Sequence, residues 1–323
     1  MTAFIIRRLI VAVPVLVGIT IIAFVILALA PGDPVAALIA PERRSSMTPE
    51  DLAAFRRALG LDGPIYVRYV RWLEGILRGD LGYSIKTGRA IADEIAPRIG
   101  PTLLLMSSSI AFATVVGIPL GIISAVRQYG TTDYVLTAIT MITISTPTFV
   151  LGLVLIYVFG VHLRLLPTGG IQTIGAPFAF GDLVAHMVLP VAILGFANAA
   201  PLMRYTRAGM LEVLNSEYVM TARAKGLLPR SVLIRHGLRS ALLPLVTFVG
   251  LLVPDLVAGA IITEQVFSWP GMGLLSVQAA NSRDPSLMMG IVLIVATAVL
   301  LANIVIDVSY SYIDPRVRLA TRG

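Results

Sequence analysis

The sequence predicts an all-α integral membrane protein with six transmembrane helices. Its 323 residues are 57% hydrophobic and only 13% charged, whereas a soluble globular chain has about 25% charged residues. The mean hydropathy is +0.87. Six hydrophobic runs are each long enough to cross a hydrocarbon core of about 30 Å, which takes roughly 20 helical residues. The chain has no cysteine, so disulfides and thiolate sites are excluded.

The six runs divide the chain into spans and connections. The first run follows a short cytoplasmic segment, residues 1–8, and is too long for the apolar part of a signal peptide, so we expect it to remain as an uncleaved span. Residues 33–100 form an external segment, residues 101–314 hold the other five spans, and residues 315–323 form a cytoplasmic tail. The expected spans are Leu9–Gly32, Thr102–Val126, Tyr134–Val161, Leu183–Met203, Ser240–Thr263 and Pro285–Ile306.

Basic residues decide the expected orientation. With the N-terminus in the cytoplasm, the inner segments hold thirteen Lys and Arg residues, whereas the two short outer loops hold only Arg164 and Arg283. Short cytoplasmic loops of membrane proteins carry such an excess of basic residues. We therefore expect the N-terminus, the connector 215–239 and the C-terminus on the cytoplasmic side.

The external segment is expected to fold as a small helical subdomain. Thr48 precedes proline and two acids, which is typical of an N-cap, so Pro49–Leu59 is predicted to be a short helix. Tyr66–Leu77 is predicted to be a second helix, because its apolar residues recur at helical spacing. These helices either contact an external partner or only pack on the spans, and the sequence leaves both open.

The connector 215–239 is strongly basic and lies between two spans. Glu217–Lys225 is predicted to be a short helix, with Asn215 or Ser216 as its N-cap and Gly226 as its left-handed stop. Pro229 is expected to begin a second helix. The charge itself has two explanations, which are docking of a cytoplasmic partner and contact with anionic lipid.

Seven ordered motifs now point to a family. Tyr218–Gly226 reads YVMTARAKG and, with Leu242–Pro244, resembles the EAA loop of ABC importer permeases of the oligopeptide/dipeptide branch, B-type (first) membrane subunit. Met220-Thr221-Ala222 stands where the general pattern has Glu-Ala-Ala, a departure that also resembles the peptide branch. The other motifs are FIIRRL at Phe4–Leu9, APGDP at Ala30–Pro34, RGDLGYS at Arg78–Ser84, GIPLG at Gly117–Gly121, VFSWPGMG at Val266–Gly273 and IDPRVR at Ile313–Arg318. The two glycines of GIPLG also predict a small-residue face for close helix packing.

The resemblance implies a subunit of a larger importer in a bacterial or archaeal cell membrane. Such permeases form half of a pore with a second, homologous permease subunit, and they work with two ATPase subunits and an external solute-binding protein. The sequence has no G-x-x-x-x-G-K-[ST] motif. We therefore expect no cofactor on this chain and no enzymatic activity of its own, with ATP and Mg used by the partner ATPases.

The resemblance also assigns residues to the coupling contact with an ATPase. They are Glu217, Tyr218, Ala222, Arg223, Ala224, Lys225 and Gly226. Relatives in this branch carry dipeptides, longer peptides, nickel chelates, glutathione or sugars, and a peptide is the expected substrate here. An ion-coupled secondary transporter is the remoter alternative, although neither inverted repeats nor several buried ionisable groups are visible.

Polar residues within the spans are the candidates for the translocation pathway. Asp255 is the one carboxylate far from either interface; it either meets a peptide ammonium or accepts a local hydrogen bond. Asn198, Ser145 and Thr146 lie near prolines that are expected to kink their helices. Trp269 and Arg283, in the external connection after span five, are candidates for contact with the binding protein. The three histidines are not spaced as metal ligands, so no metal site is expected. The expected partners are the protein subunits and membrane lipid, and nucleic acid is not expected as a partner.

The absence of cysteine makes the orientation directly testable. Single cysteines at Ser46, Ser216 and Ala320 meet no native thiol background. A membrane-impermeant thiol reagent applied to intact cells should label only position 46. Labelling of position 216 from outside would overturn the orientation.

Overall fold

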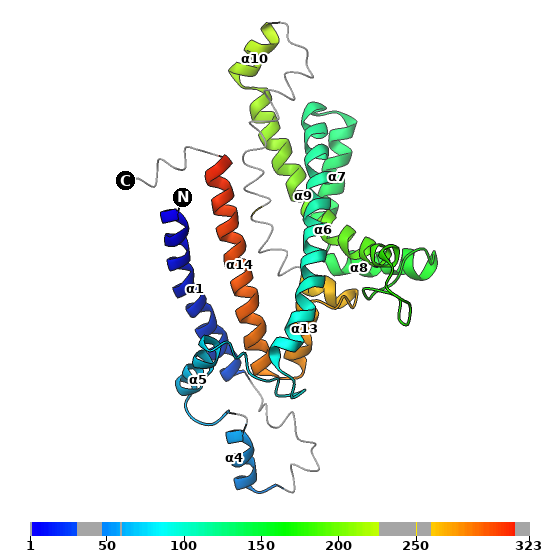
Figure 1. Cartoon of the computed structure of the whole chain (residues 1–323). Coiled ribbons are helices and arrows are strands. Elements are labelled where there is room, and N and C mark those ends of the chain that lie inside the picture. Colours follow the sequence, from blue (N-terminus) through cyan, green and yellow to red (C-terminus); the bar gives the residue numbers. More distant parts are fainter. Residues whose placement is uncertain (1, 31–46, 59, 226–249, 251–259, 314–323) are drawn as a thin grey trace. The chain divides into compact units, whose positions relative to one another are not determined.

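The computed structural model describes residues 2–30, 47–58, 60–225, 250 and 260–313. Within these residues the regular structure is helical, apart from one isolated bridge between Tyr83 and Ala90. The elements (Figure 1) are α1 (Thr2–Leu29), α4 (Pro49–Ala58), α5 (Ile65–Leu77), α6 (Ile91–Val126), α7 (Thr131–Ser145), α8 (Thr148–Leu155), the π-helix η1 (Ile156–His162), α9 (Phe180–Leu214), α10 (Glu217–Ala224), α13 (Met272–Asn281) and α14 (Pro285–Ile313).

Four described helices are long and apolar enough to cross a membrane, and a bent pair can supply a fifth span. The four candidate spans are Ile5–Leu29, Ile91–Val126, Phe180–Leu214 and Pro285–Val308. Most of the expected span Ser240–Thr263 lies outside the described residues. The all-helical fold is thus confirmed, and the spans seen are consistent with six.

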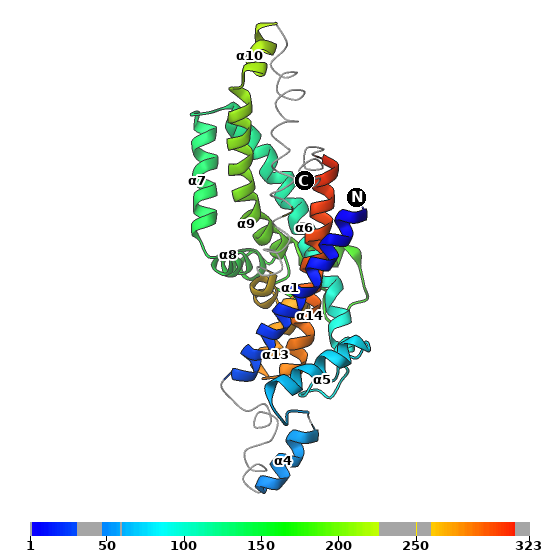
Figure 2. The same ribbon diagram turned by 90° about the vertical axis from the view of Figure 1, so that its left-hand side faces the viewer.

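The expected span Tyr134–Val161 is broken at Pro147. The helices on its two sides, Thr131–Ser145 and Thr148–His162, are bent by 102°, and Figure 2 shows α8 turned across the direction of α7. Proline has no N–H to donate and pushes the residue before it out of helical geometry. Thr146 is accordingly extended, and its hydroxyl and its N–H donate to the carbonyl of Ile142 at 2.8 Å and 3.0 Å.

Two helices extend well beyond the spans that the sequence predicts. α6 begins at Ile91 rather than at Thr102, and α9 continues past Met203 to Leu214. Both extensions carry charged residues, which a count of apolar residues excludes from a span. In α6, Asp93 and Glu94 lie in the first turn, where negative charge stabilises a helix N-terminus.

The short external helices form where they are expected. α4 ends one residue before the predicted Leu59, which lies outside the described residues, and α5 begins one residue early at Ile65. The Thr48 hydroxyl accepts from the Asp51 N–H at 3.2 Å, which confirms the predicted N-cap. In return, the Thr48 hydroxyl and N–H donate to the Asp51 carboxylate and lower its pKa.

The chain divides into two compact units. The first contains residues 1–100 and 271–301, so the external segment shares a unit with α1, α13 and most of α14. Its core packs Ile91 and Ile95 of α6 against Leu275 and Leu287. Gly290 admits this contact, because a Cβ there would lie 2.6 Å from a methyl carbon of Ile91.

A buried carboxylate closes this first unit. Asp284 is 1% exposed and its Oδ1 accepts from the Leu287 N–H at 3.0 Å, so it caps the start of α14. Its Oδ2 accepts from the Ser84 hydroxyl at 2.6 Å and from the Lys86 N–H at 3.2 Å. Ser84 ends the RGDLGYS motif, so one carboxylate ties this motif to a helix 200 residues later.

The second unit contains residues 101–270 and 302–323, and its described part is centred on α6 and α9. A Cβ at Gly117 would lie 2.8 Å from the carbonyl oxygen of Ala199, and one at Gly121 would lie 2.6 Å from that of Met203. These two glycines therefore let the backbones approach, which confirms the small-residue face predicted from GIPLG. α9 runs without a break through Pro190 and Pro201.

The Asp284 cap predicts a large local effect on stability. Asp284→Ala leaves a hydroxyl and two N–H groups without their charged acceptor, and each such hydrogen bond contributes about 1.5–3 kcal/mol. We expect the melting temperature of the detergent-solubilised chain to fall by several degrees. Asp80→Ala is the matched control, because that exposed carboxylate accepts from the Gly82 N–H. Equal melting temperatures for the two variants would contradict the cap's role.

Candidate coupling helix and translocation groove

The candidate coupling helix α10 follows α9 after two residues. Its eight residues, Glu217–Ala224, span about 12 Å, and it lies beyond the end of α9 (Figure 1). Glu217 is exposed in the first turn, where its negative charge interacts favourably with the helix dipole and stabilises the helix. The Lys225 N–H closes the last turn on the carbonyl of Thr221 at 3.0 Å. Gly226, the predicted stop, lies outside the described residues, as does Pro229.

The two expected N-cap residues make different contacts. Asn215 is the C-cap of α9, and its N–H donates to Leu211. The Ser216 hydroxyl donates backwards to the carbonyl of Val213 at 2.6 Å, while its own carbonyl accepts from the N–H groups of Val219 and Met220, both at 3.1 Å. Both residues thus serve the tight turn that joins α9 to α10.

α10 is attached to the base of α9 by apolar packing. Val219 is fully buried and packs against Val213. One turn earlier on α9, Met210 is fully buried against Ala125 of α6. The assigned residues Tyr218, Ala222, Arg223 and Ala224 all lie on α10. The short helix therefore projects from a packed support formed by α6 and α9.

An ion pair fixes this support to α7. Arg207 of α9 donates from Nε and Nη2 to the two carboxylate oxygens of Asp133, both at 2.8 Å. Asp133 is 3% exposed and also accepts from the Ser124 hydroxyl and, at 3.0 Å, from the Tyr129 N–H. A planar guanidinium matches a carboxylate in this two-bond geometry. Three segments, the ends of α6 and α9 and the start of α7, thus meet at one carboxylate.

Sequence reasoning missed this pair. Asp133 and Arg207 are 74 residues apart, and Arg207 was counted only as one of many inner basic residues. A usable signal was present, because Asp133 is a lone acid directly before a hydrophobic span. Such a residue needs a cation or several donors nearby.

A groove of about 780 Å³ opens beside α7, α8 and α9. Its polar lining comes from hydroxyl groups and two arginines, while Ile144, Ala197 and Pro201 are among its apolar residues. The polar lining residues are Thr137, Thr143, Thr146, Thr148, Arg204, Tyr205 and Arg207. Such a surface offers donors and acceptors to a polar solute in an otherwise apolar region.

The groove gathers only part of the predicted pathway set. Thr146 lines it. Ser145 is the exposed last residue of α7, and Asn198 donates to the carbonyl of Leu194 on its own helix at 2.7 Å. Asp255 lies outside the described residues.

The two candidates for contact with a binding protein differ in exposure. Trp269 is fully buried, and its indole N–H donates to the carbonyl of Pro101 at 3.0 Å. This corrects the expectation of a surface role, because an enclosed and hydrogen-bonded indole serves the core. Arg283 is exposed beside the Asp284 cap, so it remains a candidate. Among the described residues, no group of three or more His, Cys, Asp or Glu is placed to hold a metal.

Comparison with known families decides the assignment. The family model described as "Binding-protein-dependent transport system inner membrane component" matches residues 117–319, and the model for the N-terminal part of such components matches residues 1–106. The chain belongs to this family. The resemblance carried by the seven motifs is thereby confirmed, and the chain is a multi-pass inner-membrane permease.

Relatives and a solved structure agree with this assignment. The permease is 42% identical to the oligopeptide transport system permease protein AppB of Bacillus subtilis, over 98% of this chain and 99% of that one. It is 40% identical to the dipeptide transport system permease protein DppB of Escherichia coli K12, over 98% and 99%. An inward-facing structure of the MetNI methionine ABC transporter matches with a TM-score of 0.56 and 20% identity, over 68% of this chain and 96% of that one, and supports the fold.

The Asp133–Arg207 pair predicts a non-additive effect. Removing one partner of a buried pair costs about 3–5 kcal/mol, whereas replacing both by apolar residues is often neutral. Arg207 is partly exposed, so we expect Arg207→Met to destabilise the permease by about 3 kcal/mol. The double variant Asp133→Leu/Arg207→Met should recover most of that loss in thermal unfolding.

The neighbouring Arg204, which is exposed in the groove, supplies the control. Arg204→Met should change the melting temperature little. An equal loss in Arg204→Met and Arg207→Met, or an undiminished loss in the double variant, would show that the pair does not support the bundle.

Proposed function

We propose that this permease is a membrane subunit of an ATP-driven importer of dipeptides or oligopeptides. In this proposal it forms half of the pore with a second, similar permease subunit. Two ATPase subunits supply the energy, with ATP and Mg bound to them rather than to this chain, and an external solute-binding protein delivers the substrate. The chain itself is not an enzyme. Both termini and α10 lie in the cytoplasm.

The single observation that carries the proposal is that α10 projects from the packed helices α6 and α9. An eight-residue helix with an exposed acid, anchored at its own N-terminal turn, presents its remaining surface for docking. α9 is continuous over 35 residues, so displacement of α10 would be carried about 50 Å along one helix. The Asp133–Arg207 pair would pass that displacement on to α7. Glu217, Lys225 and Gly226 would frame the docking contact.

The peptide substrate is favoured by the relatives. Those named as oligopeptide and dipeptide permeases match nearly the whole chain, and one named as the glutathione permease GsiC of Escherichia coli matches at 37% identity. The groove beside α7 suits this class, because hydroxyls can pair with peptide groups and Arg204 with a carboxylate. Glutathione, nickel chelates or other small solutes are the alternative cargo for the same architecture.

A second subunit is supported by the surface of α7. Only Asp133 and Thr140 of its fifteen residues are buried. Large apolar side chains on α7, including Val135, Ile139 and Ile142, are exposed within the described chain. A second permease subunit over the groove would enclose a polar path between the two, with lipid covering the remaining apolar surface. Asp255 and Thr146 are the proposed contributors from this chain.

The coupling role predicts a loss of transport without a loss of protein. Gly226→Val should strain the left-handed stop that the sequence predicts after α10 by about 1–2 kcal/mol and misplace Lys225. We expect ATP-dependent uptake of a labelled dipeptide by the assembled complex to fall about fivefold or more at equal membrane abundance. Insensitivity of wild-type uptake to both protonophores and a sodium ionophore would exclude the proton- and sodium-coupled alternatives.

Gly175→Val is the matched control. Gly175 has a positive φ of 79°, and a Cβ there meets no atom within 4 Å, but it lies in an external loop far along the chain from α10. This variant should keep wild-type uptake. Normal transport by Gly226→Val would remove the coupling assignment, even if peptide uptake itself is established.

A further inference from the structure

A pocket in the first unit lies where two membrane helices meet an external helix. It has a volume of about 290 Å³. Its walls are the end of α1 (Phe24, Leu27, Ala28), the start of α14 (Pro285, Ser286, Met289), residues 60 and 61, and the inner side of α5 (Arg68, Arg71, Trp72). The α1 residues that line it lie one to five residues before the end of α1, so the pocket lies within about 8 Å of that helix end. This depth corresponds to the boundary between lipid headgroups and acyl chains.

α5 is held firmly over this pocket. The Tyr69 hydroxyl and the Thr20 hydroxyl of α1 are 3.0 Å apart, and the Tyr69 ring meets Phe24 edge-on at 5.5 Å between centroids. Trp72 stacks near both rings, at 5.8 Å from Tyr69 and 6.5 Å from Phe24. An aromatic cluster at a helix end is typical of the membrane interface. The pocket is therefore a formed site and not a gap between loose segments.

Two groups in the pocket lack a polar partner. Arg68 lies over the face of Phe24 at 5.8 Å, and within the described residues it makes no hydrogen bond or ion pair. Burial lowers the pKa of Arg68, opposed by the nearby charge of Asp62. The Trp72 indole N–H is shielded from water and is the one buried side-chain N or O in the described residues without an acceptor. Buried donors normally find acceptors.

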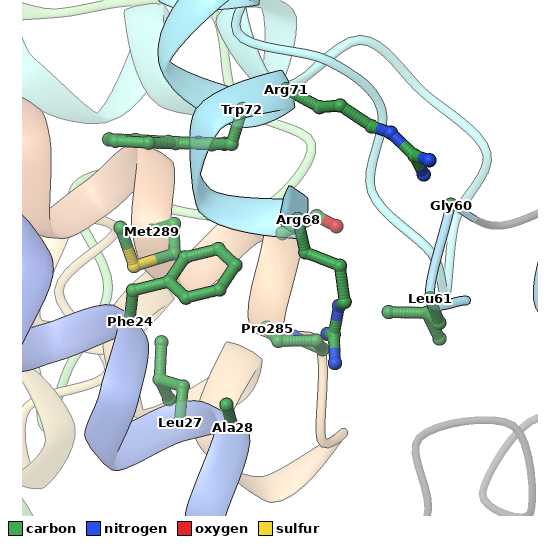
Figure 3. Close-up of a pocket in the computed structure, with 11 residues that line it drawn as sticks. Phe24, Leu27, Ala28, Gly60, Leu61, Arg68, Arg71, Trp72, Pro285 and Met289 are labelled. Atoms are coloured by element: carbon green, nitrogen blue, oxygen red, sulfur yellow. The ribbon is translucent and has the colours of Figure 1, made fainter. Parts of the chain in front are cut away.

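The charges in and around the pocket leave a positive excess. Arg71 pairs with Asp62 at 3.4 Å, which neutralises one of the two guanidinium groups. Figure 3 shows both guanidinium groups on the same side of the pocket, with Phe24, Leu27 and Met289 on the other. The site thus has a cationic, donor-rich half and an apolar half. A ligand with one negative charge and a hydrocarbon tail matches this division.

We propose that this pocket binds an anionic glycerophospholipid, with its phosphodiester on Arg68 and Arg71 and the first part of an acyl chain against Phe24, Leu27 and Met289. The volume lies at the lower end of the range of small-ligand pockets, about 300–1,000 Å³, so it holds a headgroup region rather than a whole lipid. The rest of the acyl chain continues along the exposed apolar face of α1, which includes Ile22 and Ile26. Bound lipid fastens α5 to the two spans.

The site does not depend on the proposed transport function or on the orientation. The end of α1 and the start of α14 line the same pocket, so the pocket lies in a single membrane leaflet. This conclusion is the same for either orientation of the chain. Failure of the peptide proposal would therefore leave it untouched. The phosphate on Arg68 could come from a lipid or from a small soluble phosphate. A soluble phosphate carries the same charge but has no acyl chain, so an experiment can distinguish the two ligands.

Native mass spectrometry of the delipidated full-length permease tests the proposal. Titration with phosphatidylglycerol should give tighter binding than phosphatidylcholine. Arg68→Gln should weaken phosphatidylglycerol binding about tenfold and remove the preference, because a charge-assisted hydrogen bond is lost. Arg68→Lys should retain part of it. Trp72→Phe keeps the aromatic packing and removes an N–H that is shielded from the pocket's solvent, so it should bind phosphatidylglycerol nearly as the wild type does.

Arg57→Gln is the matched control, because it removes an equal charge from exposed α4 outside the pocket. It should bind phosphatidylglycerol as the wild type does. Equal weakening by Arg57→Gln and Arg68→Gln would overturn the proposal in favour of diffuse surface charge. Unchanged binding in Arg68→Gln would overturn it as well. Effective competition by glycerol 3-phosphate would identify a free-phosphate site instead of a lipid site.

Discussion

The structure depends on the constraint that a carboxylate near a bilayer must be satisfied by the protein itself. Asp284 and Asp133 are both nearly inaccessible. Asp133 lies in the first turn of α7, and Asp284 directly precedes α14 and caps it. Each accepts at least three hydrogen bonds, from segments far apart in sequence or from a turn between helices. Because an unpaired buried charge is so costly, these bonds specify which helix ends come together.

A third carboxylate follows the same rule in the second unit. Glu264 is fully buried and accepts from the Thr102 hydroxyl at 2.6 Å, 162 residues away. Its backbone carbonyl accepts the Trp269 N–H at 2.8 Å, while the Trp269 indole reaches Pro101. Trp269 of the VFSWPGMG motif and the nearby Glu264 are thereby fixed to Pro101 and Thr102 of α6. Several of the motifs that identify the family thus carry packing roles as well.

Proline has opposite effects in two neighbouring helices, and the difference matters for the proposed coupling. At Pro147 the chain turns by 102°, whereas α9 remains helical through Pro190 and Pro201. Around Pro201 the helix is supported by the close backbone contact of α6 at Gly117 and Gly121, which α8 does not have. The continuous helix is the one that ends next to α10, so the proposed lever runs along one unbroken helix.

The sequence predicted the helices much better than it predicted their contacts. Hydrophobic runs located four spans, and the Thr48 cap and the Gly117–Gly121 face were confirmed in detail. The charged extensions of α6 and α9 were missed, because a count of apolar residues cannot distinguish a helix end from a loop. The Asp133–Arg207 pair and the groove beside α7 depend on contacts across 60 or more residues, which no local pattern encodes. Trp269 was misplaced for the same reason, since its burial is set by segments distant in sequence.

The proposed coupling requires that α9 and the start of α7 move as one rigid body beneath the coupling helix. It is tested most directly by spin labels on cysteines at Tyr134 and Glu212, which are exposed positions in a chain without native cysteine. Because the Asp133–Arg207 pair joins the two helices, the distance between the labels in the assembled complex should be the same with and without ATP. A distance that changes on ATP binding would contradict the account.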